Sequence, residues 1–486
     1  MKKITNKIHK KTLIVVIVLI VLLLSASAAF AECTMLIAGK EATEDGSIII
    51  ARNEDYGGNW AKHYILNEAE EHEKGATIES ENGFVWELPE KTLKYFSVQD
   101  WIPEWGRFHE TAINTEQVGV TATTTAGQNE KAKEVDPRIK DGLGENIVTT
   151  IVAQRAKTAR EGVKLVGKII DEKGASETFG MAIADDNEAW LLEVGGGHHW
   201  VAVRVPDDSY FVGANALRIG EVDLEDRDNY LGSEDLIEFA VENGLYDPNS
   251  GEPFHFAKAY GTAKDYSSSN YRRVWGGIDL LSPSLKVEPE AKNYPLFVKP
   301  DKKISVADAG SLLRCHYQDS EYDSINVNQE ERGIGTFSTI ESHVMQLRNW
   351  LPNSIGGVQW ISMSTPLASP YIPYYVGIQE VPEVYQIGEN EYDNKSAYWA
   401  FRSLANISSQ DYQGKGQQIR EVWQEFEQEQ YDLQENVEKA ALEIYGNDKE
   451  LANKFLSNYS TGQALRALHK AYELRDELRT AVSRGR

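Results

Sequence analysis

Cysteine is nearly absent from this chain of 486 residues, which contains only Cys33 and Cys315. Two cysteines cannot form the several disulfides of a small secreted scaffold or a four-cysteine zinc site. A structural role for both cysteines would therefore be a single disulfide between them. Metal-ligand spacing is also missing, because no H-E-x-x-H segment occurs and the neighbours His198 and His199 would face opposite sides of a strand. His316 and Cys315 could suggest a thiol protease pair, but adjacent residues of one element rarely face each other, so we expect His316 to be an ordinary structural histidine. We therefore expect no metal and no other cofactor.

Positive charge is in short supply as well. The chain has 50 Lys and Arg residues against 75 Asp and Glu residues, and its formal net charge is −25. Nucleic acids and anionic membrane surfaces are bound through basic patches, so the composition argues against both as partners. The sequence also lacks internal repeats, low-complexity tracts and proline- or glycine-rich linkers, which favours one continuous domain.

The apolar run at residues 13–24 is too short for a helix that spans a bilayer. It follows five lysines and precedes an A-F-A segment at residues 29–31, so residues 1–31 are predicted to be a secretory signal peptide. Lipoprotein leaders carry a small residue before the cysteine, whereas Glu32 precedes Cys33 here. We expect a secreted protein or one at the cell surface, without stable membrane insertion after cleavage. An uncleaved anchor is the alternative.

The first residues after this leader predict a pair of short strands, at residues 34–39 and 47–52, joined by an E-D-G-S turn. Cys33 would stand at the start of the first strand. Arg52 and Asp55 would lie just past the end of the second strand, within reach of Cys33 if the hairpin folds back.

The rest of the chain mixes strand and helix patterns. Further strands are predicted in five segments: 118–125, 179–186, 188–196, 200–205 and 209–215. Two amphipathic helices are predicted between the first and second of these segments, at 144–156 and 158–175. This order indicates an α+β protein with helices packed on largely antiparallel sheets. From residue 414 the pattern is helical with a break at 446–448, typical of an extension that serves packing or oligomerisation.

The position of Cys33 suggests a nucleophile at the amino terminus. If Glu32 is removed together with the leader, Cys33 carries an α-amino group whose ordinary pKa of about 7.7–8.0 lets it take the thiol proton. Arg52 would favour the thiolate by opposite charge, and Asp55 could accept hydrogen bonds from the ammonium group. Signal peptidase is not expected to cut after Glu32, so a second step, self-processing, is required.

Several ordered motifs then match one family. The chain resembles the cysteine dipeptidases of the N-terminal nucleophile (Ntn) hydrolases, which are related to the secernins and more distantly to penicillin V acylases and bile salt hydrolases. The matching segments are Cys33 itself, R-N-E-D from Arg52, N-T-E-Q-V-G-V-T-A-T-T-T from Asn114, G-A-N-A-L-R-I-G-E-V-D-L from Gly213, Y-R-R-V-W from Tyr271, S-L-L-R-C-H-Y-Q-D-S-E-Y-D from Ser311, I-E-S-H-V-M-Q-L-R from Ile340 and S-P-Y-I-P-Y-Y-V-G-I from Ser369.

The resemblance implies a four-layer αββα sandwich and metal-free hydrolysis of short peptides, chiefly dipeptides. It places an oxyanion-hole asparagine at Asn215, which could otherwise be a turn residue, and a second arginine at Arg273, with Arg272 as a competitor. Another oxyanion donor is expected on the strand at residues 118–125, at Thr124 or Thr125. The family often lacks a cysteine at the position of Cys315, so we expect this residue to be a small buried side chain.

These observations give one predicted function and named alternatives. We expect an exported cysteine dipeptidase with its signal peptide at 1–31, a one-residue propeptide at 32, a catalytic domain at 33–413 and a helical extension at 414–486. The catalytic residues would be Cys33, Arg52, Asp55, Asn215 and Arg273, the substrates short peptides, and a homo-oligomer is possible. The alternatives are an acylase of the penicillin V or bile salt type, a metal-dependent peptidase, and a non-catalytic exported surface protein.

Overall fold

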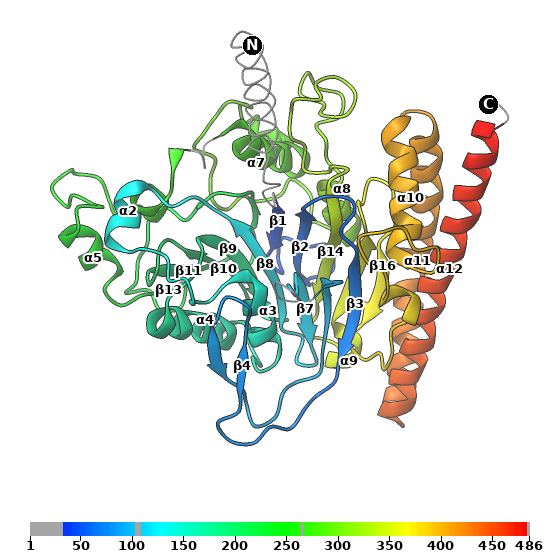
Figure 1. Cartoon of the computed structure of the whole chain (residues 1–486), viewed down its shortest axis with the longest axis horizontal. Helices are drawn as coiled ribbons and strands as arrows, with labels where there is room; N and C mark the ends of the chain where they lie inside the picture. The colour runs from blue at the N-terminus through cyan, green and yellow to red at the C-terminus, as the bar shows by residue number, and fades with distance from the viewer. Residues whose placement is uncertain (1–32, 103–107, 264–266, 484–486) are drawn as a thin grey trace, which may run out of the picture. The chain divides into compact units, whose positions relative to one another are not determined.

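The computed structural model describes residues 33–102, 108–263 and 267–483, so the predicted signal peptide and Glu32 lie outside the described residues (Figure 1). The fold is mixed α and β, with two large antiparallel sheets and a helical C-terminal region, as the sequence predicts. In order across the first sheet, the six strands are β12 (Tyr210–Gly213), β1 (Thr34–Ala38), β2 (Ile48–Asp55), β14 (Thr339–Leu347), β15 (Val358–Met363) and β16 (Ile372–Tyr375). The eight strands of the second sheet are β13 (Tyr230–Gly232), β11 (Trp200–Arg204), β10 (Ala189–Val194), β9 (Phe179–Ala184), β8 (Gly119–Thr125), β7 (Thr111–Asn114), β6 (Tyr95–Asp100) and β3 (Lys62–Asn67).

The central strands of the six-stranded sheet are buried on both faces. Every residue of β1, β2 and β14 is buried. In β2 this produces the continuous apolar run Ile48-Ile49-Ile50 in place of an alternating pattern. One face of this sheet contacts the eight-stranded sheet, where β1 and β2 meet β8, β9 and β10, and the other face contacts helices. Side chains at the end of β2 are therefore withdrawn from water.

Helices pack against each sheet (Figure 1). On the eight-stranded sheet they are α3 (Glu145–Ala153) and α4 (Ala159–Lys173), close to the predicted segments. On the six-stranded sheet α7 (Ser268–Leu281) packs against β12, and α8 (Val306–Leu313) packs against β2 and β14. The shorter helices are α2 (Glu130–Val135), α5 (Leu236–Glu242), α6 (Phe256–Tyr260) and α9 (Asn353–Gly356), and a small hairpin is formed by β4 (Thr77–Glu79) and β5 (Val85–Glu87).

The C-terminal helices stand together beside β15 and β16 (Figure 1). They are α10 (Ala397–Gln410), α11 (Lys415–Tyr445) and α12 (Lys449–Ser483), with the break between the last two where the sequence predicts it. A partly buried ion pair links α11 to the sheet region, because Arg314, which follows α8, places Nη2 2.5 Å from the Glu427 carboxylate. In the described part of the chain, no helix combines the length and apolar character needed to cross a membrane.

One expectation about the first hairpin is wrong. Arg52 and Asp55 do not follow the second strand but belong to it, since β2 continues to Asp55. The reason is a partner on each side: Arg52 pairs with Met35 of β1 and with His343 of β14, and Asp55 pairs with Thr339 of β14. The backbone of this polar segment is held by the ladder on β14, which the hairpin sequence does not reveal.

Candidate active site

Cys33 lies directly before β1, beside the end of β2. Its thiol is buried, with 1% of the residue exposed, and Sγ accepts a hydrogen bond from Nη2 of Arg52 at 2.9 Å. The register explains the meeting: Thr34 pairs with Asn53, so Cys33 stands next to the last residues of the neighbouring strand. The predicted approach of Arg52 to Cys33 is therefore present in the structure.

A carboxylate that the sequence did not single out holds Arg52 from its other side. Glu110 lies just before β7 in the facing sheet, and its Oε2 atom is 2.9 Å from Nη1 of Arg52. The guanidinium thus bridges the thiol and a buried carboxylate. A bridged guanidinium has a fixed position before any negative charge forms on sulfur.

Burial dominates the acidity of Cys33. The pKa of the thiol is raised to about 12, chiefly by burial; the charges of Asp55 and Glu110 also raise it, while Arg52 and a backbone hydrogen bond from Asp55 act to lower it. At neutral pH the thiol is therefore protonated. A cysteine in this environment requires a nearby base before it can act as a nucleophile.

Both oxygens of Asp55 are engaged by side chains that the sequence did not indicate. Arg332 binds Oδ2, and the hydroxyl of Thr339 donates to Oδ1. Burial raises the pKa of Asp55, while the charge of Arg332 and the hydrogen bond from Thr339 act to lower it. The carboxylate is thus anchored beside Cys33, to which its backbone also donates.

Asn215 and Arg273 lie on the other side of the nucleophile. Arg273, on α7, is fully buried, and its Nη1 atom donates to the carbonyl oxygen of Cys33 at 2.7 Å and to Thr34 Oγ1 at 3.2 Å. Its Nη2 atom donates to Oδ1 of Asn215 at 3.0 Å. Asn215 lies close to Cys33 because β12 pairs with β1 in a register that sets Gly213 opposite Met35.

Arg272, the competitor of Arg273, points elsewhere. Its guanidinium lies 3.8 Å from the ring centre of Tyr322 and forms ion pairs with Glu290 and Glu331. Of the two adjacent arginines, the structure thus brings Arg273 to Cys33. Neighbouring positions on a helix face different directions, which is why one of them is selected.

The predicted second oxyanion donor is not identified by these contacts. Thr124 donates its hydroxyl to the carbonyl of Gly180 at 3.2 Å within the eight-stranded sheet, and Thr125 pairs with Phe179. The register of β8 against β9 shifts between Thr121 and Thr124, so the strand is irregular at this point. The assignment of Thr124 or Thr125 stays a prediction.

Further charged residues surround the Arg52–Glu110 pair between the sheets. Lys62 of β3 lies 2.7 Å from Glu54 and 3.8 Å from Glu110, and it also binds Asp100. Burial alone would lower the pKa of Lys62, but the three carboxylates raise it above its ordinary value. Burial, followed by the charge of Glu110, raises the pKa of Glu54 although Lys62 opposes this. Carboxylates thus outnumber cations in this cluster, which favours a proton on one of them.

The remaining cysteine and histidines take part in other contacts. Cys315 is a buried free thiol, as is Cys33, so no disulfide joins them. His199 lies 2.9 Å from Asp136, and His316 is held between Asp323 and Tyr412. Among the described residues, no group of three or more His, Cys, Asp or Glu side chains is arranged to hold a metal ion.

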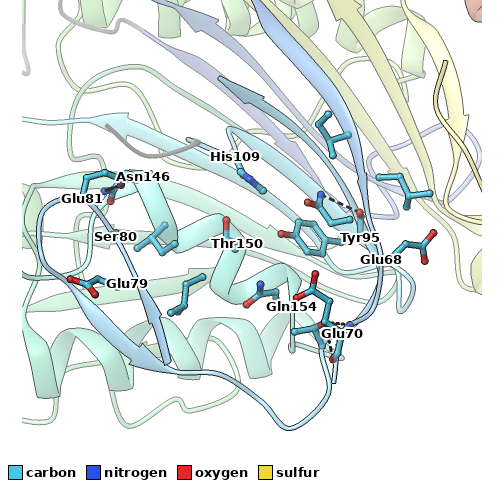
Figure 2. Close-up of a pocket in the computed structure, with 16 residues that line it drawn as sticks. Glu68, Glu70, Glu79, Ser80, Glu81, Tyr95, His109, Asn146, Thr150 and Gln154 are labelled. Atoms are coloured by element: carbon cyan, nitrogen blue, oxygen red, sulfur yellow. Dashed lines mark hydrogen bonds between the residues drawn. The ribbon is translucent and has the colours of Figure 1, made fainter. Parts of the chain in front are cut away.

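A cavity of about 510 Å³ opens elsewhere, between β4, β6 and α3 (Figure 2). It contains none of the five predicted catalytic residues. Its walls carry the carboxylates of Glu68, Glu70, Glu79 and Glu81, and Figure 2 shows His109 at its upper edge. His109 lines this cavity, whereas the next residue, Glu110, binds Arg52. The cavity and the candidate active site therefore lie on different sides of this segment, which precedes β7 of the eight-stranded sheet.

Comparisons with known proteins place the chain among relatives of one kind. Residues 32–425 match peptidase family C69. A probable dipeptidase of Salmonella dublin is 40% identical over 365 residues, which cover 74% of this chain and 83% of the relative. A probable dipeptidase of Latilactobacillus sakei is 34% identical over 430 residues, covering 87% and 88%. Probable dipeptidase B of Streptococcus pyogenes serotype M1 is 33% identical over 391 residues, covering 77% and 78%.

Proposed function

The chain belongs to peptidase family C69, a family of cysteine dipeptidases, and we propose that it is an exported enzyme that hydrolyses dipeptides with Cys33 as its N-terminal nucleophile. One observation carries the assignment of the nucleophile. The Cys33 thiol is held by Arg52 on one side, while Arg273 on the other side holds the Cys33 carbonyl together with Asn215. The other cysteine, Cys315, is buried with no comparable arrangement described around it.

The chemistry starts with removal of residues 1–32, which leaves an α-amino group on Cys33. The neutral amine takes the thiol proton, and the thiolate attacks the peptide carbonyl to form a C–S bond. The C–N bond then breaks, the leaving amino acid receives the proton from the ammonium, and a thioester remains. In the second half the amine takes a proton from water, and the hydroxide attacks the thioester. The C–S bond then breaks, and the ammonium returns its proton to the sulfur, which restores the thiol and the neutral amine.

The surrounding residues have separate tasks in this proposal. Arg52 stabilises the thiolate, and the amide of Asn215 donates to the oxyanion of the tetrahedral intermediate. Asp55, anchored by Arg332 and Thr339, orients the new ammonium group. Arg273 fixes the main chain of Cys33, so the attacking sulfur stays aligned with Asn215.

The same proposal includes the Ntn-hydrolase layering and an extracytoplasmic location. Two antiparallel sheets with helices against each of them support the four-layer αββα assignment. The charged leader with its A-F-A segment supports export. The proposal also requires a self-processing step that removes Glu32 after export, because Cys33 has an α-amino group beside its thiol only when it is the first residue.

The intact mass of protein secreted into the medium tests the central point. A mass that begins at Cys33, together with hydrolysis of a dipeptide panel, is the expected result. A mass that begins at Glu32 would leave the amine one residue away and contradict the mechanism. Cleavage of penicillin V or conjugated bile salts in preference to dipeptides would move the function to the acylase alternative.

Cys33→Ser supplies the matching variant. We expect turnover of dipeptides to fall by about 10³-fold or more, because serine is a far weaker nucleophile with an amine of this pKa. Cys315→Ser is the control, since Cys315 is equally buried but lies outside the proposed site. Normal turnover in the Cys33→Ser protein would refute Cys33 as the nucleophile.

A further inference from the structure

We propose that Asn270 is a positioning residue that fixes the amide of Asn215 for oxyanion binding, an inference that rests on the proposed function. Asn270 lies in the first turn of α7, one turn before Arg273, and 7% of it is exposed. No sequence motif marked it. Its importance follows from the hydrogen bonds that its two amide atoms make.

Asn270 and Arg273 together hold both oxygens of Asn215. Nδ2 of Asn270 donates to the main-chain carbonyl of Asn215 at 2.9 Å. Nη2 of Arg273 donates to Oδ1 of Asn270 at 2.8 Å and to Oδ1 of Asn215 at 3.0 Å. The three residues thus form a closed ring of hydrogen bonds, in which loss of Asn270 removes the hydrogen bond to the main-chain carbonyl of Asn215.

Asn215 needs such a tether because of its place in the fold. The strand β12 ends at Gly213, and Asn215 follows in a bend rather than in the sheet ladder. Its side chain is only partly buried. An asparagine in a bend can rotate about its backbone and side-chain bonds unless neighbouring groups restrict it.

The orientation of the amide decides whether it helps or hinders the reaction. With Oδ1 of Asn215 bound to Arg273, the NH₂ group occupies the other end of the amide and can donate to negative charge. A rotated amide would turn its oxygen toward the oxyanion and repel it. Oxyanion stabilisation depends on donors that are already aligned when the charge develops.

The same ring is connected to the nucleophile. Nη1 of Arg273 donates to the carbonyl of Cys33, and Nε donates to the carbonyl of Ser269 in the first turn of α7. Asn270 therefore acts on Asn215 directly, and through Arg273 it helps to keep Asn215 in register with Cys33.

The expected kinetic effect lies in the chemical step. Misplacing a catalytic group by about 1 Å costs on the order of 100-fold in rate, and removing one oxyanion donor costs about 10²–10³-fold. We therefore expect Asn270→Ala to lower kcat about 10- to 100-fold for a good dipeptide substrate. KM should change by less than about threefold, because the oxyanion exists only in the transition state.

A double-mutant cycle distinguishes positioning from a general structural role. The variants are Asn270→Ala, Asn215→Ala and the double variant, each isolated in the processed form verified by intact mass. If Asn270 acts through Asn215, adding Asn270→Ala to Asn215→Ala should lower kcat by less than about threefold. If the two losses in kcat multiply, Asn270 acts independently of Asn215 and the proposal is wrong.

Two further variants protect the test against misfolding. Asn270→Asp keeps an oxygen for Arg273 but cannot donate to the Asn215 carbonyl, so kcat should still fall while the protein folds. Tyr271→Phe is the matched control, because it removes only a hydroxyl that donates to the exposed Glu290, and its kcat should equal that of the unmodified enzyme. Full kcat in both Asn270 variants would overturn the positioning role. An unmodified enzyme without activity on dipeptides would instead overturn the proposed function and this inference with it.

Discussion

The reactivity of Cys33 before and after processing gives the sharpest test of the site. Burial is the main reason why the pKa of the thiol is raised from 9.0 to about 12. Each pKa unit changes the thiolate fraction tenfold, so at pH 7.5 the precursor should contain about 1,000-fold less thiolate than an ordinary cysteine. After processing, the α-amino group can hold the proton, and the thiol should become reactive near neutral pH.

The assay is alkylation by iodoacetamide as a function of pH, in a Cys315→Ala background so that only Cys33 reacts. A Glu32→Pro change is used to keep the precursor intact, and the mass of each protein is checked before the assay. We expect the precursor rate to rise about tenfold per pH unit without a plateau up to pH 10. We expect the processed enzyme to show an inflection near the pKa of an α-amino group, at about 7.7–8.0.

Slow access to a buried thiol could lower the rate in both proteins, but it would not change the shape of the pH profile. The shape therefore carries the conclusion, and alkylation in denaturant supplies the reference for an accessible cysteine. A precursor with an ordinary cysteine profile would refute the buried, protonated thiol. A processed enzyme with the precursor's profile would refute the amine as the base.

Four other outcomes follow from the same contacts. Glu110→Ala should lower the free energy of unfolding by about 3–5 kcal/mol in chemical denaturation, because it leaves the buried charge of Arg52 without its carboxylate; a change below about 1 kcal/mol would contradict this. Burial raises the pKa of Glu54 well above 4.5, so above that pH the native state binds more protons than the unfolded state, and the free energy of unfolding should fall as the pH rises above 4.5. In the Glu54→Gln variant the free energy of unfolding should fall less with pH than in the unmodified protein. The same pH dependence in both proteins would contradict a raised pKa of Glu54. Cys315→Ala should retain kcat within about twofold, and EDTA should leave activity unchanged; loss of activity in EDTA would favour the metal-dependent alternative.

The sequence predicted the part of the site that depends on local order. The spacing between Cys33 and Arg52 reflects a hairpin, and the hairpin alone brings the guanidinium to the thiol. Asn215 and Arg273 came from the resemblance to a family, since nothing in their local sequence distinguishes them from turn and helix residues. The structure brings these four residues together by hydrogen bonds.

The supporting residues could not be predicted because they come from distant strands and loops. Glu110 meets Arg52 across the two sheets, and Arg332 and Thr339 reach Asp55 from the segment around the start of β14. No motif accompanies any of them. Their positions depend on the register of β2 with β14 and on the packing of one sheet on the other, which a single sequence does not specify. The same register placed Asp55 inside the strand instead of beyond it.

The buried carboxylates around Cys33 hold its neighbours in position and do not lower the pKa of its thiol. Glu110 opposes formation of the thiolate, as does Asp55, so these carboxylates do not activate the sulfur in the precursor. Glu110 does, however, hold Arg52 in place before the thiolate exists, and Lys62 lies within 3.8 Å of Glu110. An arginine fixed in advance needs no rearrangement when the sulfur becomes charged. In the proposed mechanism the thiol would thus stay protonated until processing supplies an amine beside it, and the site would already be assembled at that point.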